Sequence, residues 1–324
     1  MIDAPRAHHA AAPFGSPCPH SLRLVSRTPR KALLAGALSL LAPLALLGGC
    51  ASEDPTASAS PDSPGSTGIV EIQDTTADEI AALDPDAVAR KQAAEQARAE
   101  LDSALATIEA SGANISCIAL DLVGDGVIEH DADRVYYSAS SIKGPFCVGL
   151  ARSQGDDARS RYGDLITATV VDSSNEAYET LRERVAGQPV LKNLFREAGV
   201  ERDAGHWYTD YSVRDLAAIW RVCAQWLSSD DQNARWLGGL LGDSLNSRVD
   251  DVAVGEQVIT WSKAGWFSGE ERYDVTFDGG VIKTPRGAYA IAVATDRGSD
   301  FKAIESVMRP LAALAEAEFP SARP

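Results

Sequence analysis

The sequence is poor in the residues that build metal centres and histidine-based catalytic triads. It contains five histidines, and only His130 and His206 lie beyond the first 49 residues. None of its five cysteines belongs to a C-x-x-C pair, which argues against a structural zinc site. A Ser-His-Asp triad or a His-ligated metal therefore has few candidate residues, and we expect neither a metal nor a cofactor.

Positive charge is also scarce. The chain has 30 Lys and Arg against 46 Asp and Glu, a formal net charge of −16 at pH 7. Binding to nucleic acid depends on Lys and Arg contacts with phosphate, so we expect no nucleic-acid partner. Only seven of the 324 residues are lysines, and two of these seven occupy motif positions that are described below.

The first 49 residues form a segment of their own. Basic residues between positions 23 and 31 precede an apolar run at 32–47, which ends in Gly48-Gly49-Cys50. This order is typical of a secretory signal, and the Cys after small residues resembles the bacterial lipobox. The resemblance implies cleavage before Cys50, lipidation of Cys50 and attachment to the outer face of the bacterial cell membrane. A transmembrane helix is the alternative, but the run is about 16 residues, shorter than the roughly 20 needed to span, and contains Pro43.

The sequence therefore divides into three parts. Residues 1–49 are a signal peptide, residues 50–77 are the lipidated Cys and a flexible linker rich in Ser, Pro, Ala and Asp, and residues 78–324 are a folded domain. Three cysteines remain in that domain, an odd number, and we expect buried free thiols rather than a disulfide: Cys117, Cys147 and Cys223. We expect a monomer.

Hydrophobic periodicity predicts an α+β domain. A helical pattern at 78–110 is followed by a strand at 114–123, a hairpin turn at Asp125-Gly126 and a return strand to about 131. Further helical patterns occupy 141–153, 162–186, 190–198, 213–228 and 231–241. Strands at 257–261, 273–282 and 288–295 precede a closing helix at 301–318. Because strands come from both ends of the chain, an antiparallel sheet must join them, and the central helices then form a second lobe.

The first chemical motif is Ser140-x-x-Lys143 at the start of a helical pattern. A spacing of three residues puts both side chains on one helix face. An unassisted Ser hydroxyl is a weak nucleophile, and a Lys can serve as its base if burial lowers the pKa of the amine. A second copy, Ser299-x-x-Lys302, lies among charged residues without a preceding strand, and we interpret it as solvated surface.

The second motif is Ser173-Ser174-Asn175, between two helical runs. A hydroxyl here can relay a proton to a leaving nitrogen, and an amide can hydrogen-bond a Lys or a substrate carbonyl. The alternative interpretation is a helix boundary at which Ser and Asn act as caps. Another S-x-N sequence, Ser244-Leu245-Asn246, fits the same pattern but does not stand between helical runs.

The third motif is Lys263-Ala264-Gly265 on a predicted strand. Lys263 is suited to attract a substrate carboxylate, and Gly265 allows a substrate backbone to approach closely. The alternative is an edge strand that carries a Lys for solubility.

The ordered set resembles the S-x-x-K, S-D-N and K-T-G elements of the class A β-lactamase-related serine hydrolases, a group within the β-lactamase and penicillin-binding superfamily. The resemblance covers about 78–318. It implies an α+β, β-lactamase/transpeptidase-like fold, with an antiparallel sheet flanked by helices, a reduced helical lobe and a site between the lobes. It also implies a β-lactam or peptidoglycan peptide as substrate. Ser140 would be the nucleophile, Lys143 the base and Ser173 the proton relay, while substrate would be bound by Asn175, Lys263, Ala264 and Gly265.

The chain departs from the family pattern at several points. Ser174 replaces an Asp and Ala264 replaces a Thr. The family's water-activating Glu, followed shortly by Asn, is missing, because no Asn occurs between Asn193 and Asn233. Acids in that region, none of them in the family context, are Glu197, Glu201, Asp203 and Asp210. Release of the acyl group is therefore the step that these departures affect most.

Three functions remain open from the sequence. The first is a hydrolase that turns over β-lactams or D-Ala-D-Ala-like peptides through an acyl-enzyme at Ser140. The second is a penicillin-binding protein of the same fold that loses its acyl group slowly. The third is a non-catalytic lipoprotein that binds cell-wall fragments or another protein.

Overall fold

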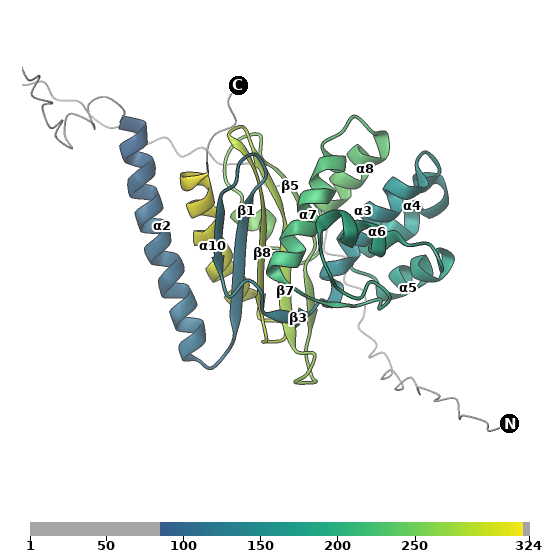
Figure 1. Cartoon of the computed structure of the whole chain (residues 1–324), viewed down its shortest axis with the longest axis horizontal. Coiled ribbons are helices and arrows are strands. Elements are labelled where there is room, and N and C mark those ends of the chain that lie inside the picture. The colour runs from purple at the N-terminus through teal and green to yellow at the C-terminus, as the bar shows by residue number, and fades with distance from the viewer. Residues whose placement is uncertain (1–84, 320–324) are drawn as a thin grey trace, which may run out of the picture. The chain divides into compact units, whose positions relative to one another are not determined.

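A six-stranded antiparallel sheet lies at the centre of the domain (Figure 1). The structure, a computed structural model, describes residues 85–319; the expected signal peptide, Cys50 and linker lie outside this range. The strand order is β2-β1-β8-β7-β5, and β6 also pairs with β7. The strands are β1 (Ile115–Asp121), β2 (Val127–His130), β5 (Ile259–Ser262), β6 (Gly265–Phe267), β7 (Val275–Thr284) and β8 (Gly287–Thr295). Since β1 pairs with β8, both ends of the domain meet in one sheet, as predicted.

Two long helices cover one face of this sheet (Figure 1). They are α2 (Pro85–Ala110) and α10 (Phe301–Glu318). A Pro is well suited to the first helical position, where its missing N–H would have no partner anyway. The two helices pack through a buried cluster that includes Leu105, Ile304 and Leu311 together with side chains of β1 and β8. Burial of this apolar stripe holds the terminal helices on the sheet.

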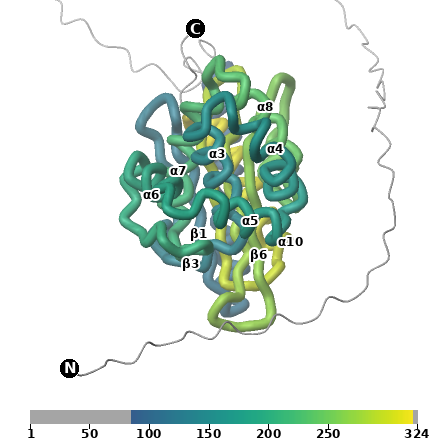
Figure 2. The backbone as a smooth tube through the Cα atoms, turned by 90° about the vertical axis from the view of Figure 1, so that its right-hand side faces the viewer, coloured from purple at the N-terminus to yellow at the C-terminus, as the bar shows by residue number. Residues whose placement is uncertain are grey.

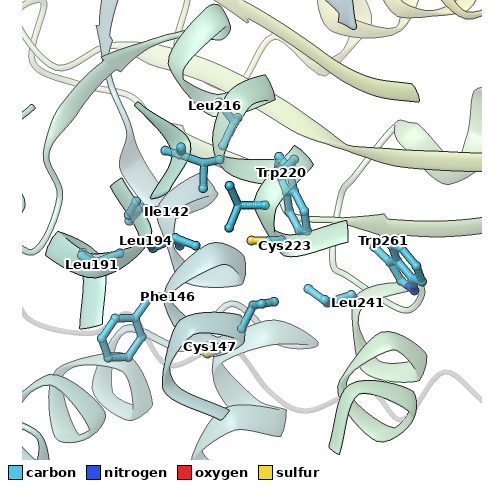
Figure 3. Close-up of a cluster of buried hydrophobic side chains, with 14 of the residues drawn as sticks. Ile142, Phe146, Cys147, Leu191, Leu194, Leu216, Trp220, Cys223, Leu241 and Trp261 are labelled. Atoms are coloured by element: carbon cyan, nitrogen blue, oxygen red, sulfur yellow. The ribbon is translucent and has the colours of Figure 1, made fainter. Parts of the chain in front are cut away.

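The opposite face of the sheet carries the helical lobe. Its members are α3 (Lys143–Gln154), α4 (Asp157–Val170), α5 (Asn175–Arg184), α6 (Val190–Ala198), α7 (Val213–Leu227) and α8 (Gln232–Leu241). Helix α7 packs on β7 and β8, and α3 contacts α4, α6, α7 and α8. Figure 2 shows α3 among its neighbours from the lobe's outer side. The core between lobe and sheet includes Phe146, Leu194, Trp220 and Trp261 (Figure 3).

A two-stranded sheet lies close to the start of α3. It pairs β3 (Val135–Tyr137) with β4 (Asp210–Ser212). Directly after β3 comes the 3₁₀ turn η1 (Ala139–Ile142), and directly after β4 comes α7. Ser212 and Asp215 form a capping box that begins α7, because each side chain binds the other residue's backbone N–H. The short sheet therefore fixes where α3 and α7 enter the lobe.

The structure corrects one predicted element and adds several. The helical pattern at 162–186 is wrong as a single helix, because α4 ends at Val170 and α5 begins at Asn175. Ser173 between them has a φ of 57°, a left-handed conformation that interrupts a helix. The short elements β3, β4 and α9 (Val249–Val252) were not predicted. The strand predicted for Lys263-Ala264-Gly265 is interrupted, because β5 ends at Ser262 and β6 begins at Gly265.

One further sequence expectation concerns the described residues. Cys117, Cys147 and Cys223 are buried free thiols, as expected. Within residues 85–319, no helix is both long enough and apolar enough to span a bilayer.

Candidate active site

Ser140 lies in the tight turn η1 that leads directly into α3. Its neighbours Ala139, Ser141 and Ile142 are buried, whereas Ser140 is partly exposed. The Ser141 hydroxyl donates a 2.6 Å hydrogen bond to the Ser138 carbonyl and shares a 2.5 Å hydrogen bond with the Tyr211 hydroxyl. Ala139 has a φ of 44°, an uncommon conformation for a residue with a side chain. The buried hydrogen bonds of Ser141 thus fix the turn and leave Ser140 partly exposed to solvent.

Lys143 is fully buried at the first position of α3. Its Nζ donates hydrogen bonds to the Ser173 carbonyl at 2.8 Å and to Asn175 Oδ1 at 2.6 Å. The ring of Tyr178 lies 5.7 Å from Nζ, and burial among such groups lowers the pKa of Lys143 to about 8. An amine with this pKa loses its proton far more readily near neutral pH than an exposed lysine, as a general base must.

In the Ser173–Asn175 segment, one residue caps a helix and the other two lie at the candidate site. The Ser174 side chain accepts a 3.1 Å hydrogen bond from Ala177 N, so the helix-cap interpretation is correct for Ser174. Ser173 Oγ is buried and has no hydrogen-bond partner within residues 85–319. Asn175 reaches Lys143, and the Tyr208 hydroxyl donates to the same Asn175 oxygen at 3.3 Å. A buried, unpartnered hydroxyl beside a lysine is available to a reacting group.

Neither competing motif reaches Lys143 in the described structure. In the Ser244–Asn246 loop, Leu245 N donates to the Val171 carbonyl at 3.1 Å, so this loop lies beside the segment that leads to Ser173. Ser299 is exposed, and its hydroxyl bonds to the Ser268 hydroxyl at 2.7 Å. The structure therefore brings together the Ser140 and Ser173 motifs and leaves the two alternatives at other positions.

Lys263 approaches the same region from the sheet. Its side chain is fully buried, and Nζ donates to the Ala264 carbonyl at 2.9 Å. Burial, and then the positive charge of Lys143, lower the pKa of Lys263 to about 7. A Cβ on Gly144 would lie 2.8 Å from Lys263 Cβ, so the absence of a side chain on Gly144 lets the strand and α3 meet. The sequence predicted a lysine that attracts a substrate carboxylate, and the structure encloses this lysine beside Lys143.

Ala264 and Gly265 differ in what they offer the site. Ala264 as a whole has no exposed surface, and its carbonyl accepts the hydrogen bond from Nζ of Lys263. At Gly265, a Cβ would lie 2.6 Å from Ser140 N and 2.7 Å from the Ser138 carbonyl. Real Cβ atoms do not approach backbone so closely, so Gly265 is needed for β6 to lie against the turn that holds Ser140.

A second backbone donor is expected from a neighbouring strand, but the sequence did not name its residue, which lies one position after Gly265. Lys263 N donates to the Gly279 carbonyl at 3.0 Å, and the register continues through Gly265 opposite Phe277. Hydrogen-bonded and non-bonded pairs alternate along an antiparallel ladder, so the N–H of Trp266 is directed away from β7. The N–H groups of Trp266 and Ser140 can together stabilise an oxyanion. The alternation of hydrogen-bonded pairs along the strand after Gly265 is the pattern from which the Trp266 donor could be predicted.

Aromatic rings border the site on the side of β3. The Tyr137 ring lies 6.1 Å from Tyr208, 6.3 Å from Phe267 and 5.2 Å from Tyr273, centroid to centroid. Burial raises the pKa of Tyr137 to about 12, so this hydroxyl is neutral at physiological pH. Phe267 follows Gly265 by two residues on β6 and is 39% exposed, which makes the border accessible to a ligand. Within residues 85–319, no three His, Cys, Asp or Glu side chains are grouped to hold a metal ion.

Comparison with known proteins adds a sequence match and a fold match. A sequence model of the beta-lactamase enzyme family matches residues 148–319, a span that begins just after Lys143. Among solved structures, the β-lactamase from Sphaerobacter thermophilus DSM 20745 has a TM-score of 0.55 and 20% identity, over 68% of this chain and 97% of that one. A halotolerant bacterial β-lactamase has a TM-score of 0.54 and 16% identity, over 68% and 98% of the two chains.

A penicillin-binding relative is also similar in fold. A mutant of PBP-A, solved as an acyl-enzyme complex with penicillin G, has a TM-score of 0.51 and 17% identity, over 66% of this chain and 96% of that one. At these identities the structural likeness establishes the fold alone. No curated protein matches the sequence.

Proposed function

Because the chain belongs to the beta-lactamase enzyme family, we propose that it is a serine hydrolase that forms an acyl-enzyme at Ser140. Its substrates are β-lactams or cell-wall peptides that end like D-Ala-D-Ala. The observation that carries the proposal is the position of Lys143, fully buried three residues after Ser140 and bonded to the Ser173 carbonyl and Asn175 Oδ1. A nucleophile, a base of lowered pKa and a second hydroxyl on one site are the groups that acyl transfer requires.

Acylation begins with transfer of the Ser140 hydroxyl proton to neutral Lys143. Oγ of Ser140 attacks the carbonyl carbon of the amide, and the oxyanion that forms is stabilised by the N–H groups of Ser140 and Trp266. The carbon–nitrogen bond then breaks, and the leaving nitrogen takes a proton through the Ser173 hydroxyl. The buried, unpartnered state of Ser173 Oγ supports this role, because no competing hydrogen bond within the described residues holds it.

Lys263 and Asn175 prepare the site for this step. Lys263 places a second amine in the region, and burial together with the positive charge of Lys143 lowers the pKa of Lys263, so this second amine loses its proton near neutral pH. Asn175 directs Nζ of Lys143 by accepting its hydrogen bond. We assign substrate contact to the exposed Asn175 side chain and to the β6 backbone at Gly265 and Trp266.

Mass spectrometry of the intact protein after incubation with penicillin G tests the proposal. The mass should increase by one penicillin, and Ser140→Ala should abolish that increase. If the wild-type protein never gains the mass, the acyl-enzyme proposal is wrong and the non-catalytic alternative is favoured.

A slowly deacylating penicillin-binding protein is the second candidate. It is favoured by the missing Glu-then-Asn pattern and by the fold shared with PBP-A. Rapid hydrolysis of nitrocefin would exclude it, whereas an adduct that persists for hours would support it.

We also propose that the protein is exported and anchored through Cys50, which lies outside the described residues. The basic segment, the apolar run and the Gly-Gly-Cys sequence support this localisation. Detergent-phase partitioning of the protein expressed in bacteria tests it, since Cys50→Ser should move the protein from the detergent phase to the aqueous phase.

A further inference from the structure

Four acidic residues lie between the end of α6 and the start of β4, and two of them have partners away from the candidate site. Glu197 forms a 2.6 Å ion pair with Arg152. Asp203 accepts a 2.8 Å hydrogen bond from Gly205 N and lies 3.3 Å from Nε2 of His206. The exposed side chains of Glu201 and Asp210 are not among the charges that act on Lys143. Glu197 and Asp203 are therefore occupied by other partners, and the charge of Asp210 acts on Tyr137 rather than on Lys143.

Glu179 occupies a different place, on the helix that begins at Asn175. The Ser174 cap fixes the start of α5, so residues three and four positions after Asn175 lie on the same face as Asn175. That face meets Lys143, because Asn175 Oδ1 accepts from Nζ and the Tyr178 ring lies 5.7 Å from Nζ. Glu179, one turn after Asn175, is half-buried there.

The Glu179 carboxylate has no hydrogen bond or ion pair within residues 85–319. The cation nearest in sequence, Arg182, is occupied: it donates to the Tyr178 hydroxyl at 3.3 Å and stacks 5.3 Å from the Phe146 ring. The negative charge of Glu179 partly opposes the lowering of the Lys143 pKa by burial and adds to the raising of the Tyr208 pKa, which agrees with a carboxylate on the helix face that meets Lys143. A half-buried acid that no partner neutralises, next to the base of the reaction, needs a functional explanation.

We propose that Glu179 is the general base that activates water for hydrolysis of the acyl group on Ser140, an inference that rests on the proposed acyl-enzyme. The water oxygen attacks the ester carbonyl carbon while one water proton passes to the Glu179 carboxylate. The bond between that carbon and Oγ of Ser140 then breaks, and the proton moves from Glu179 to Oγ. One water is consumed, a carboxylic acid is released and the free hydroxyl of Ser140 is restored.

The decay of the adduct tests this assignment with the full-length protein and penicillin G as the probe. Intact mass is followed after excess penicillin is removed, for wild type, Glu179→Gln and Glu183→Gln. A general base contributes about 10²–10⁴-fold, so the adduct on Glu179→Gln should decay at least about 100-fold more slowly than on wild type. Formation of the adduct should change little. Glu183→Gln removes the same charge from an exposed position on the same helix and should decay like wild type.

The outcomes separate this inference from the proposed function. Equal decay on Glu179→Gln and wild type overturns the role of Glu179 and leaves the acyl-enzyme intact, as does a wild-type adduct that never decays. Failure of Glu179→Gln to form an adduct would assign Glu179 to acylation or to the fold, and so would overturn the role in hydrolysis. Absence of any adduct on wild type overturns the acyl-enzyme itself, and the role of Glu179 with it.

Discussion

Nζ of Lys143 and Oδ1 of Asn175 are joined by a 2.6 Å hydrogen bond, which connects the start of α3 to the start of α5. The two residues are 32 positions apart in sequence. The bond is charge-assisted when the amine is protonated, and such bonds are shorter and stronger than neutral ones. It positions the amine for the hydroxyl three residues before it, so the geometry of the base depends on a side chain from another helix.

Asn175→Ala should therefore slow acylation of Ser140. A hydrogen bond to a charged group contributes about 1.5–3 kcal/mol, which corresponds to a loss of roughly 10- to 100-fold if most of it acts in the acylation step. The rate at which penicillin G forms its adduct, read by intact mass, measures the effect. Ser174→Ala is a suitable control, because Ser174 caps α5 and does not contact Lys143. It should reduce stability by about 1 kcal/mol while acylation stays closer to wild type.

The pH dependence of acylation should follow the amine of Lys143. Its pKa is lowered to about 8, mainly by burial. The neutral amine is the active base, so the acylation rate should rise about tenfold per pH unit below 8 and level off above it. Lys263 loses its proton at about 7 and is neutral over the upper part of this range.

Asn175→Asp should shift the midpoint of this pH profile in a predictable direction. A carboxylate at the position of Asn175 Oδ1 would stabilise the protonated amine of Lys143, because opposite charges favour the ionised form. The midpoint of the acylation profile should then move to higher pH by about one unit or more. A midpoint that stays at 8, or that moves down, would mean that Lys143 is not the group whose titration limits acylation.

Sequence patterns located the long elements well and the short ones poorly. The predicted ranges 190–198 and 301–318 agree with α6 and α10. In each, the apolar residues recur with the 3.6-residue period of an α-helix and form a stripe on one face. Strands β3 and β6 have three residues each, too few to show alternation. The break between α4 and α5 occurs at a left-handed Ser173; the helical pattern at 162–186 continues through it, although the Ser173 motif by itself suggested a helix boundary.

The site was predictable where it depends on side chains in ordered motifs. Lys143, Ser173 and Asn175 meet, as their order along the chain suggested. A second N–H donor from a strand was expected, but it could not be assigned to Trp266, because any residue supplies a backbone N–H and no residue type marks it. Burial of Lys263 also could not be read from the sequence, since it results from close packing against Gly144 across two elements.

Gly265→Ala should abolish acylation. The added Cβ would lie 2.6 Å from Ser140 N and still closer to Ser141 N, so either β6 or the turn must move. Both oxyanion donors belong to these two segments. Overpacking of this kind costs about 1–3 kcal/mol of stability, which circular dichroism under denaturant would detect.

Gly239→Ala is the matched control for that substitution. Gly239 lies within α8, and a Cβ there meets no atom within 4 Å. Ala in a helix interior is favoured over Gly by roughly 0.5–1 kcal/mol, so this variant should be more stable than wild type and should acylate normally. Equal acylation by the two Gly→Ala variants would show that Gly265 does not set the approach of β6 to Ser140.

Replacement of Lys263 by Met should change stability in a pH-dependent way. The folded-state pKa of Lys263 is about 7, below the value of 10.5 that is usual for a lysine in an unfolded chain. Between these two values the unfolded state holds more protons on this group than the folded state, so Lys263 makes wild-type stability rise with pH over that window. Lys263→Met lacks this contribution, and its stability relative to wild type should fall between pH 6 and pH 9.5. Urea unfolding of both proteins at the two pH values measures the difference.

Lys283→Met, on the partly exposed end of β7, is the control. It removes a solvated charge, so its stability relative to wild type should stay constant. A constant difference for Lys263→Met as well would mean that Lys263 keeps an ordinary pKa despite its burial.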